Sequence, residues 1–506
     1  MTESSRPAIY RHLVGGRLLT CDSNNPIIEN GEIWIRDDLI AALGPAGDVA
    51  RPENAIDVEE TDVSGRLIIP GLINGHSHSY AALLKGSVDT QPLDIYMLNV
   101  IAKNSNRTPR EVYVSTLVDC ITMIRTGTTG VIDHFSHRPA LTDEALEAAM
   151  QAFHDSGMRA AVAPMFADLP YVETIPLNPD ALPDDIRKTY SDMSRPDIGA
   201  YFDVLENALD GLDQFDGRVG LLLGIDGPQR CSEDLLDAAA TFQNKHRLGL
   251  HTHMLETKTQ AVMAGDKGLV RDLLDRGILN NKSTLVHFIW CDDDDIAAAK
   301  EADATLVHCP TSTVLVGSGI SPVLRLRRQG LPIAIGTDGA NCGPVCLFEK
   351  IRLATLLQHV TEPDFESWLT SEEMFRMAME GGARALGRPG EIGVLRAGAK
   401  ADLAVVDPSS HWHRPLGDPW NHIVYYESGV GVEQVYADGQ LLLDSGKLVT
   451  IDEAAILAEA EEIIGRQQQD RQEADSFVAR QYPAFRDMVV ETLRREDPVD
   501  RLVRLR

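Results

Sequence analysis

The sequence predicts an α/β fold in which a (β/α)8 TIM barrel is joined to a small β-sandwich domain and followed by a helical extension. Strand-and-helix alternation fills the middle of the chain, strand-and-turn patterns lie on both sides of it, and charged helical patterns fill the end. We assign residues 1–66 and 390–450 to the β-sandwich, 67–389 to the barrel and 451–506 to the helical extension.

The β-sandwich is predicted from similar patterns near both ends of the chain. Residues 31–43 alternate apolar and polar side chains between Gly, Asn and Asp residues that favour turns. Residues 401–407 form another short apolar run, and residues 432–443 are typical of a hairpin around Asp438-Gly439. We therefore expect the two ends of the chain to build one small domain together.

The barrel is predicted from short apolar runs that alternate with helical patterns. The runs are residues 67–73, 129–132, 160–165, 219–225, 248–251, 284–288, 304–307 and 332–335. The clearest helical patterns between them are residues 143–156, 232–245, 258–275 and 294–301. Such alternation implies parallel βαβ units, and the number of units implies a closed barrel. Residues 175–197, rich in Pro and Asp, are predicted to form a long loop over one barrel face.

The last part of the chain is predicted to be helical. Residues 454–469 and 474–495 both carry apolar side chains at helical spacing. These helices would pack either on their own barrel or on another subunit, so a homo-oligomer (a dimer or larger) stays open.

Composition excludes several classes of partner. The formal net charge of −29 disfavours nucleic acid and anionic membrane surfaces and leaves a small-molecule substrate. The odd number of cysteines, 7, with no Cys-x-x-Cys pair, argues against a disulfide framework or a structural zinc cluster. The N-terminus lacks an apolar leader core and no apolar run reaches about 18 residues, so we expect a cytoplasmic protein without a membrane span.

Histidines follow the predicted strands at the barrel end where active sites form. His76 and His78 stand two residues apart at the end of the first run, and alternate strand residues point to the same side. His253 after the fifth run and Asp338 after the eighth can complete a site with nitrogen and oxygen ligands. Such a donor set suits Zn(II) or Fe(II), so the sequence predicts a divalent metal at the barrel mouth.

Glu256 is a candidate for proton transfer. It lies three residues beyond His253, which can bring its carboxylate back over the metal. The alternative is an ordinary carboxylate at the start of a helix.

These motifs resemble those of a known family. The string Pro-Gly-Leu-Ile-Asn-Gly-His-Ser-His at residues 70–78 looks like the first metal motif of the amidohydrolase superfamily. The strings His253-Met254-Leu255-Glu256, His308-Cys309-Pro310 and Gly336-Thr337-Asp338-Gly339, with the lone His287 between the first two, follow in that family's order. Together with residues 398–403 they resemble the cytosine deaminase-like, S-adenosylhomocysteine deaminase-like and triazine hydrolase subgroup, over residues 17–450.

The resemblance implies specific roles. It places one divalent ion on His76, His78, His253 and Asp338. It makes Glu256 the proton shuttle and His287 a hydrogen-bond partner of the water or the substrate. In the mechanism we expect, Asp338 accepts a proton from water while it stays near the metal. No residue matches the bridging lysine of binuclear relatives, which favours a single metal.

Four positions are assigned to the substrate. Asp226 stands where purine-nucleoside relatives carry a His before a Pro-x-x-Cys string. His134, with His137 nearby, either faces the substrate or caps its strand. His308 and Cys342 follow the seventh and eighth strands, close to the predicted metal.

The resemblance implies hydrolytic deamination of an amino-substituted N-heterocycle of the purine, pyrimidine, pterin or s-triazine type. Water would add to a C=N carbon, and ammonia would leave. The same site could instead hydrolyse a chloro-heterocycle, urea, carbamate or amide, and analysis of the products separates these reactions. A further alternative is a catalytically inactive barrel that acts as a binding protein. Metal analysis that finds no bound ion, together with no hydrolysis of a broad panel of compounds, would support it.

Overall fold

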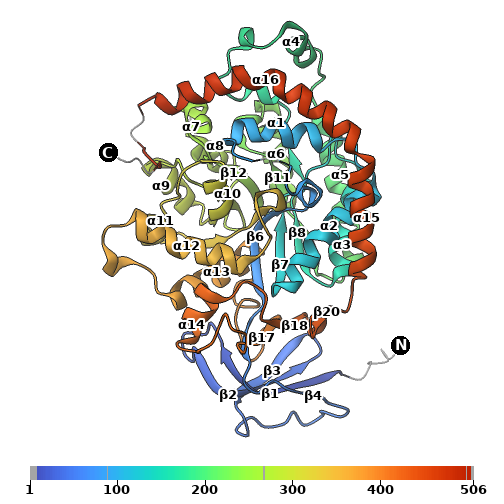
Figure 1. The fold of residues 1–506 in the computed structure, drawn as a ribbon, viewed down its shortest axis with the longest axis vertical. Coiled ribbons are helices and arrows are strands. Elements are labelled where there is room, and N and C mark those ends of the chain that lie inside the picture. Colours follow the sequence, from blue (N-terminus) through green and yellow to red (C-terminus); the bar gives the residue numbers. More distant parts are fainter. Residues whose placement is uncertain (1–7, 88, 266–267, 497–498, 503–506) are drawn as a thin grey trace.

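The computed structural model describes residues 8–87, 89–265, 268–496 and 499–502. A barrel surrounded by helices forms the body of the molecule, a sheet from both ends of the chain lies at one end, and helix α16 (Gln468–Arg494) crosses the opposite end (Figure 1). This arrangement confirms the predicted fold class. The residue limits of the three parts stay a prediction, and the first seven residues, where no leader was expected, lie outside the described residues.

Parallel strands form the barrel wall. They are β6 (Leu72–His78), β7 (Thr128–Asp133), β8 (Arg159–Val162) with β9 (Met165–Phe166), β10 (Val219–Leu221) with β11 (Leu223–Ile225), β12 (Leu250–Met254), β13 (Thr284–His287), β14 (Thr305–His308), and β15 (Ile333–Ile335) with β16 (Asp338–Gly339). Every predicted apolar run therefore contains strand residues, and the wall is almost entirely buried.

The ring closes because interrupted strands change partners. β10 pairs with β8, and after Leu222 the same chain segment continues as β11 and pairs with β12. β15 pairs with β14, and β16 then pairs with β6, with Asp338 opposite Ser77. The Thr337 backbone N–H donates to the carbonyl oxygen of His76 at 3.0 Å between the two. Asp338 is thereby held next to the His-x-His strand.

Helices follow the strands and cover the barrel. They are α1 (Leu93–Lys103), α2 (Pro109–Arg125), α3 (Asp143–Ser156), α4 (Asp184–Ser191), α5 (Ile198–Asp210), α6 (Glu233–His246), α7 (Lys258–Ala264), α8 (Leu269–Asp275), α9 (Asp293–Glu301), α10 (Pro310–Leu315), α11 (Val323–Arg328), α12 (Leu347–Thr361), α13 (Ser371–Ala385) and α14 (Pro419–Asn421). No helix in the described ranges combines the length and apolar character needed to cross a membrane.

Two helical predictions need correction. The pattern at residues 258–275 was predicted as one helix, but α7 ends at Ala264, before Gly265, whose φ of +52° does not continue a helix. The loop predicted at residues 175–197 contains α4, because Ile186 and its neighbours bury an apolar side against the C-terminal helix.

The sheet from both chain ends contains β1 (Tyr10–Leu19), β2 (Ile27–Arg36), β3 (Leu39–Pro45), β4 (Glu59–Asp62), β5 (Leu67–Pro70), β17 (Leu403–Val406), β18 (Val432–Ala437), β19 (Gln440–Asp444) and β20 (Lys447–Leu448). β5 pairs with β1 on one side and β17 on the other, which joins the two chain ends in one sheet. Both halves contribute to one buried cluster that includes Ile33 and Leu403. The Asp-Gly hairpin is confirmed: Asp438 and Gly439 have φ of +53° and +71°, and a Cβ on Gly439 would lie 1.8 Å from the oxygen of Asp37.

The first predicted barrel strand, residues 67–73, is divided in the structure. Leu67–Pro70 belongs to the terminal sheet as β5, and the barrel strand begins at Leu72. Both segments are buried on all sides, so a continuous apolar run could not show where the chain passes from one sheet to the next.

The C-terminal helices pack on their own barrel. α15 (Glu453–Arg466) lies against α2, where Arg110 and Glu459 form an ion pair with 2.6 Å between Nη2 and Oε2. α16 buries Phe485 and Met488 against α1. α16 therefore covers the end of the barrel where the strands finish, and α15 lies along its side (Figure 1).

Candidate active site

The His-x-His pair ends strand β6. His76 and His78 are both buried, and β16 places Asp338 beside them. His78 Nδ1 donates to the carbonyl oxygen of His134 at 2.7 Å, and His253 Nδ1 donates to the carbonyl oxygen of Asp226 at 2.7 Å. Each bond leaves the Nε2 atom of its ring free, and the two Nε2 atoms lie 3.3 Å apart. Two ring nitrogens this close, each in a ring whose Nδ1 already donates elsewhere, are arranged to share a cation.

A different partner orients His76. Its Nδ1 lies 2.8 Å from Nε2 of His251, whose Nδ1 lies 2.5 Å from Oγ1 of Thr284. The Thr284 hydroxyl donates to the carbonyl oxygen of Leu250 at 3.3 Å, so it accepts from His251. The relay therefore sets His76 Nδ1 as a donor and frees His76 Nε2, which is buried with no hydrogen-bond partner in the described chain.

Asp338 supplies the oxygen ligand of the cluster. Its Oδ1 lies 3.4 Å from His78 Nε2 and 3.8 Å from His76 Nε2. Burial raises the pKa of Asp338, but the neighbouring His78 and His287 lower it more, so the net shift is downward. Asp338 is thus a carboxylate at neutral pH.

These residues fit a divalent metal. His76, His78 and Asp338 can each offer a ligand atom within 4.8 Å of the others, and the same holds for His76 with His253 and His287. Burial keeps the pKa of His76 well below its ordinary value, so the ring is neutral, as a ligand must be. Three imidazoles and one carboxylate form a donor set typical of zinc.

Glu256 and His287 face the ligand cluster. His287 Nε2 lies 3.6 Å from Glu256 Oε1 and 3.8 Å from Asp338 Oδ2. Burial raises the pKa of Glu256 to about 8, so its carboxyl group is protonated at neutral pH. Burial lowers the pKa of His287 to about 3, so this ring is neutral. The pair can hold a transferable proton beside the metal position.

The backbone at this site is unusual. Leu255, His287, Phe288 and Asp338 have φ of +49°, +71°, +46° and +62°. This left-handed region is rare for residues other than glycine and costs free energy. It turns the chain sharply where strands β12, β13 and the β15–β16 segment deliver their functional side chains.

A cavity opens above the cluster, and only some of the predicted substrate residues line it. Asp226 and Cys342 line the cavity, together with Glu256, His287 and Asp338. His134 is fully buried beside His78 and His253, with an exposure of 0%, and His308 lines a separate cavity near Ser321. The described geometry does not favour substrate contact for His134 or His308.

His137 is bound by the backbone. Its two ring nitrogens lie 2.7 Å and 2.9 Å from the carbonyl oxygens of Ala140 and Arg107. Of the two roles considered for it, contact with the substrate or capping of its strand, these bonds to backbone carbonyls favour the capping role.

Comparison with known proteins identifies the family. Residues 67–442 match the sequence profile of the amidohydrolase family. The chain belongs to the amidohydrolase family. Membership confirms the predicted hydrolase class and the resemblance on which it was based.

Curated relatives of this amidohydrolase are deaminases. The 5'-deoxyadenosine deaminase of Methanothermobacter thermautotrophicus is 30% identical over 440 residues, which cover 86% of this chain and 94% of the relative. The 5-methylthioadenosine/S-adenosylhomocysteine deaminase of Pyrococcus furiosus is 28% identical over 443 residues, 85% of this chain and 98% of the relative.

Solved structures confirm the fold. An adenosine deaminase from Xanthomonas campestris with bound zinc has a TM-score of 0.77 at 23% identity and covers 92% of this chain and 98% of its own. An atrazine chlorohydrolase from Arthrobacter aurescens complexed with zinc has a TM-score of 0.78 at 24% identity, covering 90% of this chain and 100% of its own.

Sequence reasoning missed several cavity residues of this amidohydrolase. Arg230 lines the cavity and forms an ion pair with Asp226, with 2.8 Å between Nη1 and Oδ2. Arg230 lies inside the Pro-x-x-Cys string that follows Asp226, and no role was assigned to it. A charged residue just after a barrel strand could have indicated that it reaches the site. Helix α1 contributes Tyr96 and Met97, and the sequence held no signal that this helix reaches the site.

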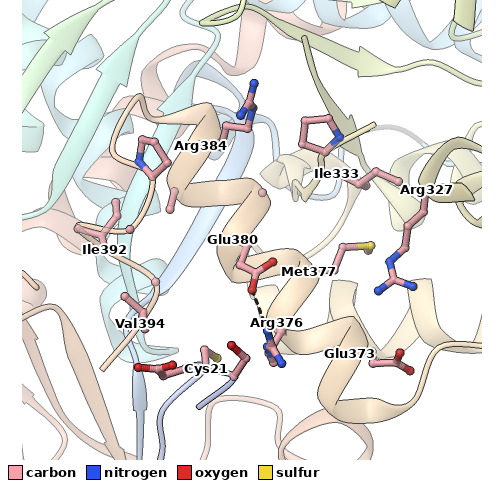
Figure 2. Close-up of a pocket in the computed structure, with 18 of the residues that line it drawn as sticks. Cys21, Arg327, Ile333, Glu373, Arg376, Met377, Glu380, Arg384, Ile392 and Val394 are labelled. Carbon is pink, nitrogen blue, oxygen red and sulfur yellow. Dashed lines mark hydrogen bonds and ion pairs between the residues drawn. The ribbon is translucent and has the colours of Figure 1, made fainter. Parts of the chain in front are cut away.

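A larger cavity lies at the other end of the barrel, where β15 begins. It has a volume of about 610 Å³ and is formed by α13, the turn after β1 and the loop that precedes β17 (Figure 2). Arg376 and Glu380 form an ion pair in it, with 3.2 Å between Nη2 and Oε1.

Proposed function

We propose that this amidohydrolase is a hydrolytic deaminase of an amino-substituted N-heterocycle. The observation that carries the proposal is the position of Glu256, a buried carboxyl group held 3.6 Å from His287 beside a cluster of metal-binding donors. Deamination needs a proton donor next to an activated water, and this pair supplies the donor. The deaminase relatives support the proposal.

We propose a single zinc ion on His76, His78, His253 and Asp338. The zinc-bound structural neighbours and the donor set support zinc, and Fe(II) shares the same donors. Bound there, the ion supplies Lewis acidity and lowers the pKa of a water molecule. Metal analysis of the purified protein, with reloading after chelation, decides between the two ions.

The side chains divide the proton transfers in the proposed reaction. The Asp338 carboxylate accepts the proton of the attacking water, and neutral His287 hydrogen-bonds the reacting oxygen. Glu256 protonates the ring nitrogen next to the attacked carbon. Asp338 then passes its proton to the amino group, the hydroxyl proton of the tetrahedral adduct returns to Glu256, and the adduct collapses to form a C=O bond and release ammonia.

Hydrolysis of a chloro-heterocycle is the second candidate. The atrazine chlorohydrolase shares this fold at a TM-score of 0.78, and the same proton transfers would expel chloride. Urea, carbamate and amide bonds are further substrates for such a site.

A screen of the zinc-loaded protein against amino-, chloro- and ureido-compounds tests the proposal. We expect ammonia from an amino-heterocycle, detected together with a product one mass unit heavier than the substrate. Chloride release alone would replace the first candidate with the second. The absence of hydrolysis in a metal-loaded sample would contradict both.

We further propose that the protein is cytoplasmic and acts on a small molecule. α15 and α16 already pack on their own barrel, so they do not require a second subunit. A homo-oligomer stays a prediction, and sedimentation of the full chain measures it directly.

A further inference from the structure

The turn after β13 carries His287 on a strained backbone. His287 and Phe288 have φ of +71° and +46°, in the left-handed region that costs free energy for residues other than glycine. The backbone N–H groups of Phe288, Ile289 and Trp290 donate at 2.9–3.1 Å to carbonyl oxygens at the end of β12 and just beyond it. These bonds hold one side of the turn.

Arg501, in the segment after α16, holds the other side of this turn. Its Nε donates to the carbonyl oxygen of Ile289 at 2.8 Å, and its Nη2 donates to the carbonyl oxygen of Cys291 at 3.0 Å. A guanidinium is planar and presents its N–H groups in fixed directions, so these two bonds fix the turn more closely than one bond from a flexible amine would. The two partners Arg501 and Ile289 lie 212 positions apart in the chain.

The main chain of Arg501 is fixed as well. Its carbonyl oxygen accepts from the backbone N–H of Ile320, between α10 and α11, at 3.0 Å. Gly319 allows this approach, because its φ is +116° and a Cβ there would lie 2.9 Å from that oxygen. The neighbouring Leu502 packs against the main buried cluster. Arg501 therefore reaches the turn from an anchored segment.

The position of this turn matters for the proposed reaction. His287 Nε2 lies 3.6 Å from Glu256 Oε1 and 3.8 Å from Asp338 Oδ2, so a shift of the turn changes both distances. A displacement of about 1 Å at a reacting group can lower the rate about 100-fold. Within the described residues, the hydrogen bonds of Arg501 go to the loops after β13 and β14, whereas the proposed metal ligands lie on β6, β12 and β16.

We propose that Arg501 is a positioning residue that holds the turn after β13 so that His287 faces the reacting groups. The inference rests on the proposed function, in which His287 hydrogen-bonds the reacting oxygen. Arg501 acts through His287 and needs no contact with the substrate. The end of the chain thus contributes to the site as well as to packing.

Hydrogen exchange, followed by mass spectrometry, tests the contact without a substrate. In the zinc-loaded full chain, Arg501→Ala should speed exchange at residues 288–290 at least tenfold, because the turn is then held from one side only. Exchange in β7 and the affinity for zinc should stay within twofold of wild type. Arg486→Ala, which removes an exposed arginine of α16 that bonds its neighbour Asp487, is the matched control. Equal exchange at the turn in the two variants overturns the inference.

Kinetics test whether the contact acts through His287. With the best amino-heterocycle of the screen, Arg501→Ala should lower kcat at least tenfold. Arg501→Lys, which keeps the charge and one donor, should lower it less. Added to His287→Asn, Arg501→Ala should lower kcat less than twofold, because the group that it positions is already absent. An equal loss in both backgrounds overturns the inference.

The two measurements separate this inference from the proposed function. If the zinc-loaded wild type hydrolyses none of the compounds, the proposed function fails. Faster exchange at the turn in Arg501→Ala would still show that Arg501 holds the turn. Hydrolysis by the wild type with unchanged exchange and unchanged kcat in Arg501→Ala overturns the inference alone.

Discussion

The two cavities at opposite ends of the barrel differ in size and in chemistry. The cavity beside α13 (Figure 2) has a volume of about 610 Å³, and the cavity above the His cluster has a volume of about 50 Å³. The larger one is lined by arginine and acidic side chains that pair with one another or meet solvent, such as Arg376 with Glu380. The smaller one collects buried imidazoles and carboxylates whose pKa values are strongly shifted. Volume alone therefore does not locate the site in this protein.

The difference follows from how a barrel is built. Side chains at the carboxyl ends of the strands converge on the axis, whereas the opposite end is filled by turns and by packing against the terminal sheet. At that end Arg159 of β8 and Asp402 form a buried ion pair, with 2.7 Å between Nε and Oδ2. One end is organised for chemistry and the other for stability.

The largest expected effect comes from Asp338→Asn. The amide keeps the shape of the side chain but cannot accept the proton of water, so we expect turnover to fall at least about a thousandfold. Asn tolerates the left-handed backbone, so circular dichroism and the melting temperature of the metal-free protein should stay close to wild type. Retained activity would remove Asp338 from the proposed mechanism.

Glu256→Gln should lower kcat by about 10²–10⁴-fold. Because Glu256 must be protonated to donate, wild-type activity should fall as pH rises past its pKa, which burial raises to about 8. A bound cation lowers that pKa, so the descending limb should lie at or below pH 8. A pH profile of kcat checks the sign. An ascending limb at this position would instead assign Glu256 as a base.

His251→Leu should weaken metal affinity by about 10–100-fold, because His76 loses the partner that sets its tautomer. Competition with a chelator measures the affinity separately from the melting temperature. His251→Gln, whose amide oxygen can accept from His76, should restore part of it. Unchanged affinity in the Leu variant would show that the relay has only a packing role.

The smallest effect is expected at the larger cavity. Arg376→Gln removes an ion pair that is partly exposed to solvent, so the free energy of unfolding should change by no more than about 1 kcal/mol. Its kcat/KM should stay within about twofold of wild type. A tenfold loss would show that the two ends of the barrel are coupled.

Most of the fold could be predicted because strand burial and helix amphipathicity are local properties of the sequence. The helix at residues 143–156 was predicted with the same limits as α3, since Thr142 caps its start and Gly157 ends it. The transition between sheets near Gly71 could not be predicted, because both sides are buried strands. The helix within residues 175–197 was missed, because tertiary contacts stabilise it more than its own pattern does.

The metal-binding histidines could be predicted because strand period and strand end are both visible in the chain. His251 was visible as well, but its role depends on a 2.8 Å contact with a residue 175 positions away. The position of α1 beside the cavity could not be predicted, because it depends on how α16 packs against that helix. Loop and helix placement is decided by long-range packing, which one sequence does not reveal.

The left-handed backbone at Leu255, His287, Phe288 and Asp338 has a consequence for engineering this protein. Each such residue lowers the free energy of unfolding by about 1–3 kcal/mol, so substitutions that relieve this backbone strain would make the protein more stable. A search for heat-resistant variants would find glycine at positions such as His287, and that substitution would remove a side chain of the proposed mechanism. Screens for a more thermostable, active enzyme should therefore hold these residues constant and vary the terminal sheet and the outer helices.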